Sequence, residues 1–233
     1  MKTMGFHPSV PRLTPTPQRP AGAINQMDKK CKICRRAGEK LFLKGERCFT
    51  PKCAFGRKAY PPGKRDSERK HRSTVTEYGL QLREKQKVRN VYGLSEKQFS
   101  NYVKRVTGRE GDPSEKLYEE METRLDNVVF RIGLAKSRSE ARQMVSHGHI
   151  LVNDKRLTVP SHQVKVGDIL KIRAGSMVKI PFMGLAERPS KGSIPAWLSF
   201  DQRKAEAVVL GKPILDKGAS EFKLTSVIEY YSR

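Results

Sequence analysis

The stretch from Arg124 to Asn153 constrains the fold of this chain more than any other part of it. It reads RLDNVVFRIGLAKSRSEARQMVSHGHILVN, and its apolar residues recur at helical spacing over 125–132 and again over 141–145. Ser137, with Glu140 three residues later, is typical of the first turn of a helix. Two amphipathic helices are therefore predicted, each with one face that joins a core.

The basic residues of this stretch do not follow the apolar stripes. Arg138 and Arg142 are four residues apart and share one helix face, which we expect to be exposed. A solvated basic face is one interpretation, and neutralisation by nucleic-acid phosphate is the other. His147 and His149 fit either a helix end or an RNA contact. The candidate RNA-binding residues in and beside this stretch are Arg124, Arg131, Lys136, Arg138, Arg142, His147, His149, Asn153 and Lys155.

The charge of the whole chain favours nucleic acid. Its 233 residues include 47 Lys plus Arg against 24 Asp plus Glu, a net charge of +23, which attracts polyanions at long range. No apolar run approaches the roughly 18 residues that a membrane-spanning helix needs, so we expect no membrane partner. No secretory signal is visible either, so a reducing compartment is expected.

All four cysteines lie within 23 positions. They form the pattern Cys31-x2-Cys34-x13-Cys48-x4-Cys53, which predicts a structural metal site with four thiolate ligands. Zinc is the expected metal, and an iron–sulfur cluster is the alternative because it also takes four thiolates. Four unrelated buried thiols are a weaker interpretation of so tight a cluster. With sulfur at all four positions, we expect no open coordination site for catalysis.

Further helices and strands are predicted from capping and periodicity. The expected helices include 76–92, a second that begins after Ser95, and a third that begins at Asp112-Pro113. After Gly148 the pattern alternates, which predicts short strands around 150–152, 157–159 and 169–172. The segment 181–200 contains three prolines and is expected to be a loop around Trp197, whereas the apolar C-terminal residues should dock on a core.

The proline-rich N-terminus differs from the rest of the chain. Residues 1–27 contain five prolines and little apolar periodicity, so we predict a disordered tail. A start of translation at Met27 and a transit peptide are the two further interpretations of this segment.

No catalytic motif stands out. The five histidines form no metalloprotease-like array, and no phosphate-binding loop or nucleophile motif is visible. We therefore expect no enzymatic activity. An RNA-modifying enzyme or a tRNA-binding factor would need a further catalytic domain, and a DNA-binding zinc finger would need a recognition helix after its ligands.

Several segments of the sequence together resemble the S4 family of small-subunit ribosomal proteins. Besides the stretch from Arg124 to Asn153, the similar segments are CKICRRAGEKLFLKGERCFTPKC, YGLQLREKQKVRNVYGLSEKQF, IPAWLSFD and IEYYSR, in collinear order over 29–233. The resemblance implies an α+β fold, with a metal-bound segment at 28–60 and a mainly helical domain at 61–121 completed by 181–233. A small α/β RNA-binding domain at 122–180 is inserted into that helical domain.

The resemblance also implies a function and partners. A structural, rRNA-binding protein of the small ribosomal subunit is expected, which binds the 5′ domain of the rRNA early in assembly. It would contact ribosomal protein S5 and line the path by which mRNA enters, on ribosomes of the cytoplasm or, with a transit peptide, of an organelle. The family's loop after the YPPG segment differs here but stays basic, and a basic run follows in the next helix. These two segments add the candidate RNA-binding residues Lys64, Arg65, Arg69, Lys70, Arg72, Arg83, Lys85, Lys87 and Arg89.

Overall fold

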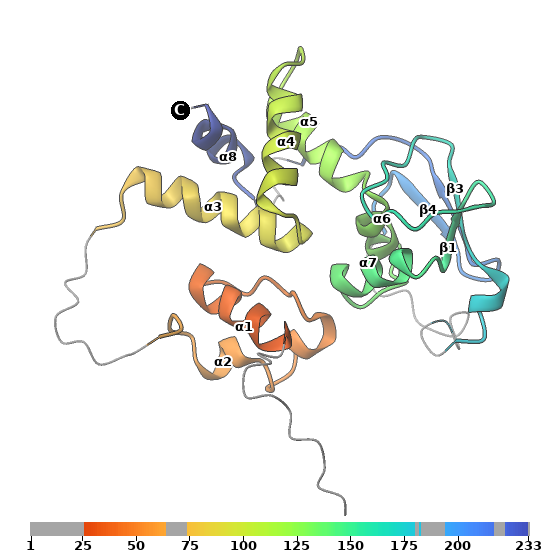
Figure 1. Cartoon of the computed structure of the whole chain (residues 1–233), viewed down its shortest axis with the longest axis horizontal. Coiled ribbons are helices and arrows are strands. Elements are labelled where there is room, and N and C mark those ends of the chain that lie inside the picture. Colours follow the sequence, from red (N-terminus) through yellow and green to blue (C-terminus); the bar gives the residue numbers. More distant parts are fainter. Residues whose placement is uncertain (1–25, 64–73, 180–181, 183–193, 217–221, 233) are drawn as a thin grey trace, which may run out of the picture.

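The chain folds around two hydrophobic cores, as a computed structural model shows for residues 26–63, 74–179, 182, 194–216 and 222–232. One core belongs to the helices of the first half and the C-terminal helix, and the other lies between a helix pair and a sheet. Figure 1 shows these two parts side by side, with the N-terminal helices packed below them. The expected tail lies outside the described residues except at its end, where Gln26 and Met27 begin the first helix.

The first part is helical, and its helices begin where the sequence predicts them. Ser95 and Asp112 each accept a hydrogen bond from a backbone N–H of the first turn that follows, so the two caps predicted here are confirmed. Thr76 caps the helix expected over 76–92 in the same way. The elements of this part are α1 (Gln26–Ala37), η1 (Gly45–Cys48), α2 (Ala54–Arg57), α3 (Glu77–Tyr92), α4 (Glu96–Thr107) and α5 (Pro113–Glu122).

Two shorter helices follow and carry the stretch from Arg124 to Asn153. They are α6 (Leu125–Arg131) and α7 (Arg138–Ser146), and the hydroxyl of Ser137 accepts from the backbone of Glu140 as predicted. The Glu140 carboxylate accepts from the backbone N–H of Lys136 at 2.7 Å, one residue earlier than in a standard capping box. The buried stripes of both helices pack in the second core.

A five-stranded antiparallel sheet completes the second core, with the order β2-β1-β3-β5-β4. Its strands are β1 (Ile150–Val152), β2 (Lys155–Arg156), β3 (Ile169–Ile172), β4 (Leu198–Asp201) and β5 (Glu206–Val209). Asn153 and Asp154 both have positive φ, 49° and 63°, which gives the two-residue turn that suits a β-hairpin. The predicted strand at 157–159 is not formed, because β2 ends at Arg156.

The segment around Trp197 is the main correction to the predicted fold. We expected a loop over 181–200 and assigned all of 181–233 to the helical domain. Instead, β4 begins at Leu198 and β5 pairs with β3 through Leu170 and Ala207, so these strands belong to the sheet and its core. These two short strands follow proline-rich residues, and β5 pairs with a strand 37 positions earlier in the sequence, from Ala207 to Leu170.

The C-terminal helix returns to the first part of the molecule. Helix α8 (Leu224–Tyr231) buries Leu224 and Val227 in the helical core and lies along α3, as Figure 1 shows. The prediction that the C-terminus docks on a core is confirmed, and the fold class is α+β. Among the described residues, no helix is both long and apolar enough to cross a membrane.

Candidate nucleic-acid interface

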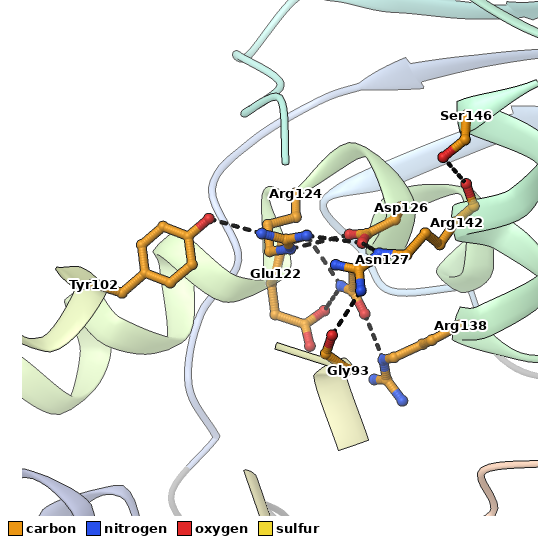
Figure 2. Close-up of polar contacts among 9 residues, drawn as sticks. All are labelled: Gly93, Tyr102, Glu122, Arg124, Asp126, Asn127, Arg138, Arg142 and Ser146. Atoms are coloured by element: carbon orange, nitrogen blue, oxygen red, sulfur yellow. Dashed lines mark hydrogen bonds and ion pairs between the residues drawn. The ribbon is translucent and has the colours of Figure 1, made fainter. Parts of the chain in front are cut away.

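Arg124 lies inside the molecule, between its two parts. Its side chain is fully buried and forms two hydrogen bonds to Asp126, at 3.1 and 2.8 Å, while Nη1 donates to the Tyr102 hydroxyl of α4 at 2.7 Å. Figure 2 shows the guanidinium held between these two partners. Burial opposes the charge, but the bonds to Asp126 outweigh it, and the pKa of Arg124 is raised. Arg124 therefore presents no surface to RNA in this structure.

Arg131 forms a second ion pair in the same region. Its Nε and Nη2 donate to the Glu122 carboxylate at 2.8 and 2.7 Å, and the Tyr92 hydroxyl donates to that carboxylate at 2.6 Å. Asn127 adds a donor at 2.9 Å. Burial alone would raise the pKa of Glu122, but the hydrogen bond and charge of Arg131 overcome it, so the pKa lies below its usual value.

Arg138 and Arg142 are only partly exposed, and both contact neighbouring elements. Arg138 Nε donates to Asn127 at 2.8 Å, and its guanidinium lies over the rings of Tyr92 and Phe130. Arg142 donates to Asp126 at 3.2 Å and to the carbonyl of Gly93 at 2.6 Å (Figure 2). Our expectation of a freely exposed arginine face on α7 is therefore wrong, because this face is turned toward α6 and the end of α3.

We call the network of hydrogen bonds and ion pairs formed by these arginines and their partners the polar junction. The junction links α3, α4, α5, α6 and α7 through two buried carboxylates and four arginines. It therefore connects the helical part to the part that carries the sheet. Its members are Tyr92, Tyr102, Glu122, Arg124, Asp126, Asn127, Arg131, Arg138 and Arg142.

The basic run of α3 is largely paired with acids of the protein. Lys85 is buried and bonds Glu96 at 2.6 Å, Arg89 bonds the same carboxylate at 2.9 Å, and Lys87 pairs with Glu39 at 2.7 Å. Arg83 is exposed and has no ion pair among the described residues. The predicted loop residues Lys64, Arg65, Arg69, Lys70 and Arg72 lie outside the part of the chain that the structure describes.

An exposed group of cations lies instead at the end of α7 and beside the β1–β2 hairpin. His149 lies near Arg156, Arg173 and Lys179, and its ring packs against that of His147 at a centroid distance of 5.8 Å. Partial burial, followed by these four neighbouring basic groups, lowers the pKa of His149. We call these five residues the basic cluster. Its concentrated positive charge suits phosphate oxygens.

The backbone of the basic cluster is held by short-range contacts. His149 Nδ1 lies 2.9 Å from the Ser176 hydroxyl, and the backbone N–H of Arg173 donates to the His149 carbonyl at 2.9 Å. Gly148 has φ +69°, and a side chain there would collide with the guanidinium of Arg156. The cluster is thus built on ordered backbone, which brings these side chains to one part of the surface.

The remaining predicted residues flank this cluster or stand apart from it. Lys155 is exposed in β2 and has no ion pair among the described residues, whereas Lys136 pairs with Glu46 at 3.2 Å. The Asn153 amide is engaged by the start of β3, because it donates to Asp168 at 2.8 Å and accepts from the backbone of Ile169. Sequence reasoning missed Arg156, Arg173 and Lys179, which are spread over 24 positions and form no local run.

The four cysteines lie in the segment that contains α1, η1 and α2. Cys34 and Cys48 are buried, Cys31 and Cys53 partly so, and all four thiols are free. Burial raises the pKa of the Cys34 thiol, although a backbone N–H of Leu41 lowers it; the other three cysteines add further upward shifts, so all four are near neighbours. Backbone N–H groups of Gly56 and Phe55 bond the Cys53 sulfur and lower its pKa.

One observation favours a metal site at these cysteines and another does not. Thiol sulfurs that accept backbone N–H bonds suit a thiolate–metal site. Against this, no three candidate ligand side chains among the described residues stand in metal-binding geometry. The donor chemistry fits a four-thiolate site, but the side-chain positions do not form one.

Comparison with known proteins shows which family this chain is similar to. The profile of the ribosomal protein S4/S9 N-terminal domain matches residues 25–122, and that of the S4 domain matches 123–170. Small ribosomal subunit protein uS4 of Syntrophomonas wolfei is 44% identical over 88% of this chain and 98% of its own length. The uS4 proteins of Pelotomaculum thermopropionicum and Ruminiclostridium cellulolyticum are each 45% identical over 87% and 88% of this chain, and 96% and 98% of their own lengths.

The chain belongs to the ribosomal protein S4 family. The two matched S4 segments meet between Glu122 and Thr123, in the middle of the polar junction. The sheet of this S4 protein continues past the matched S4 domain, because β4 and β5 follow residue 170.

Proposed function

We propose that this S4-family protein is a structural constituent of the small ribosomal subunit that binds rRNA and catalyses no reaction. The observation that carries the proposal is its similarity to uS4 proteins along nearly their whole length. The net charge of +23 supports it, because a large part of that charge needs neutralisation by a polyanion.

The basic cluster is the part of the described surface that best fits rRNA phosphate. Arg173 and Lys179 are exposed and form no ion pair among the described residues, so their charge is available to a ligand. RNA helices bury their base edges in a deep major groove, so side chains that approach such a helix meet the backbone first. We infer that this cluster, with Lys155 and Arg83, contributes affinity more than sequence selectivity.

The finer parts of the proposal rest on the resemblance to the family. They are binding to the 5′ domain of the rRNA early in assembly, contact with ribosomal protein S5, and a position along the path by which mRNA enters the subunit. The proposed location is the ribosome, in the cytoplasm or in an organelle if residues 1–26 are a transit peptide.

Sedimentation tests the function directly. The tagged full chain should sediment with small subunits in a gradient, and should remain there after a wash in high salt. The purified chain should also bind the 5′ domain of its rRNA more tightly than an unrelated structured RNA of equal length. A chain that leaves the subunit at high salt and binds both RNAs equally would contradict the proposal.

We further propose that Cys31, Cys34, Cys48 and Cys53 hold one structural zinc ion. The N–H bonds to the Cys53 sulfur and the mutual proximity of the four thiols support it. The bound metal would supply much of the folding free energy of this segment, which has a small core of its own. Its role would be to fix the positions of α1, η1 and α2.

Elemental analysis tests the metal. We expect about one zinc per chain, and loss of that zinc in Cys34→Ser, with Ser199→Ala as a matched control at an exposed serine of β4. Iron with visible absorption would indicate a cluster in place of zinc. Metal-free protein whose segment 28–60 resists proteolysis as well as the metal-loaded protein would refute the site.

A further inference from the structure

Two phenylalanines are stacked on the outside of the cysteine segment. The rings of Phe42 and Phe49 are stacked, with their centroids 4.9 Å apart and their planes inclined by 24°. Phe49 is 76% exposed and Phe42 is 42% exposed, so the pair presents an aromatic face to solvent. Neither ring is needed by the two hydrophobic cores.

The backbone around Phe42 holds its ring outward. Leu41 is buried, Gly45 closes a turn by donating to the Phe42 carbonyl at 3.1 Å, and a side chain at Gly45 would collide with the carbonyl of Lys136. Phe42 itself has φ +46°, a left-handed conformation that is uncommon for a bulky residue. Such a backbone is maintained only where its surroundings enforce it, and it is a reason to look for a function.

The charges beside the rings indicate what could cover them. The same stretch of chain, residues 39–52, contains the cations Lys40, Lys44, Arg47 and Lys52. Its acids, Glu39 and Glu46, are paired with Lys87 and Lys136. A purely apolar protein surface would fit the rings but would leave these cations uncompensated. An unpaired nucleotide has both a flat aromatic base and an anionic phosphate.

We propose that the Phe42–Phe49 pair is a stacking platform for one unpaired base of the rRNA, while the adjacent lysines and arginine contact its flanking phosphates. The proposal rests on the proposed rRNA-binding function and adds a specific contact to it. The base stacks on the outer face of Phe49, the more exposed ring, and Phe42 supports that ring from behind.

Substitutions at Phe49 in the full-length chain, measured with its own small-subunit rRNA, test this platform. Phe49→Ala and the double variant Phe42→Ala/Phe49→Ala should each weaken binding by about tenfold, as expected for the loss of one stacked base. The slope of log affinity against log salt should stay unchanged, because no counterion contact is removed. Phe49→Trp should bind as the wild type does, and Phe49→Leu should not. Leu210→Ala, at a 59% exposed leucine outside this segment, is the matched control and should have no effect.

Chemical probing of the bound rRNA should show one unpaired base that the wild type protects and that Phe49→Ala leaves reactive. Binding within twofold of wild type by the double variant would overturn the platform, while the proposed function would stand. Full affinity in Phe49→Leu would also overturn it and would indicate a merely apolar contact. If the double variant unfolds, the Trp and Leu variants still decide. Failure of the wild type to bind rRNA would instead refute the proposed function.

Discussion

The polar junction and the basic cluster contain the same kinds of residue in opposite surroundings. Arg124, Arg131, Arg138 and Arg142 end at carboxylates, an amide or a carbonyl of the protein, and Arg124 is fully buried. Arg173, which directly follows β3, is exposed and forms no ion pair among the described residues. Arginines spaced closely in one basic stretch can therefore hold the fold together, while dispersed ones form the surface that a polyanion would meet.

The difference lies in which charge compensates each arginine. In the junction the protein supplies the anions Glu122 and Asp126, so the arginines there are neutralised before any ligand arrives. In the basic cluster, partial burial and then the neighbouring basic groups lower the pKa of His149, and a phosphate backbone would relieve the repulsion among these groups. Substitutions in the junction should therefore change stability, and substitutions in the cluster should change binding.

Removing Arg124 should produce the largest effect. Arg124→Ala leaves Asp126 without its bidentate partner and leaves the buried Tyr102 hydroxyl oxygen without the guanidinium N–H that donates to it. We expect a loss of ~3–5 kcal/mol in the free energy of unfolding. Urea denaturation followed by circular dichroism measures it. Arg173→Ala is the matched control. A loss below about 1 kcal/mol would show that the junction does not hold the two parts together.

The second effect is a dependence of stability on pH through Glu122. Its folded-state pKa is lowered, so it stabilises the fold above its unfolded pKa, near 4.3, and this contribution is lost as pH falls through the lower folded value. Glu122→Gln should thus be much less stable than wild type at pH 7, and the gap should narrow below about pH 4. Denaturation at several pH values checks this, with Glu110→Gln, an exposed glutamate, as the control. A constant gap would show that ionised Glu122 is not what the junction needs.

Arg142 should have a smaller effect on stability. Its side chain is 36% exposed, so the loss of its bonds to Asp126 and Gly93 should cost about 1–2 kcal/mol, discounted for solvent screening. The salt dependence of rRNA binding should stay as in wild type. Thermal unfolding and filter binding of Arg142→Ala measure the two. If the slope of log affinity against log salt decreases while stability is unchanged, Arg142 contacts RNA, as the sequence suggested.

Local signals in the sequence predicted the helices, because a cap and its partner are only two or three residues apart. Ser95, Asp112 and Ser137 each bond a backbone N–H that the sequence pattern already indicated. The strands β4 and β5 were missed because they are short and follow a proline-rich segment. What identifies them is the pairing of β5 with β3 and of β4 with β5, and the first of these is a contact between distant positions that periodicity does not reveal.

The partners of the arginines could not be predicted for the same reason. Helical spacing correctly places Arg138 and Arg142 on one face of α7, but it does not say that this face meets Gly93 and Asn127. Conversely, Arg156, Arg173 and Lys179 converge only when the hairpin and the turn after β3 are folded. The sequence shows how much charge there is, whereas tertiary structure decides which charges are already neutralised.

The smallest change in stability is expected in the basic cluster, where the effect should appear in binding alone. Arg173→Ala removes an exposed cation, so the free energy of unfolding should change by less than about 0.5 kcal/mol. Affinity for rRNA should fall, and the slope of log affinity against log salt should decrease by roughly one counterion equivalent, for cognate and unrelated structured RNA alike. Arg173→Lys keeps the charge and should restore the slope. If Arg173→Ala instead lowers stability as much as Arg142→Ala and leaves the salt slope intact, the cluster is a second structural junction, and the contrast between the two regions fails.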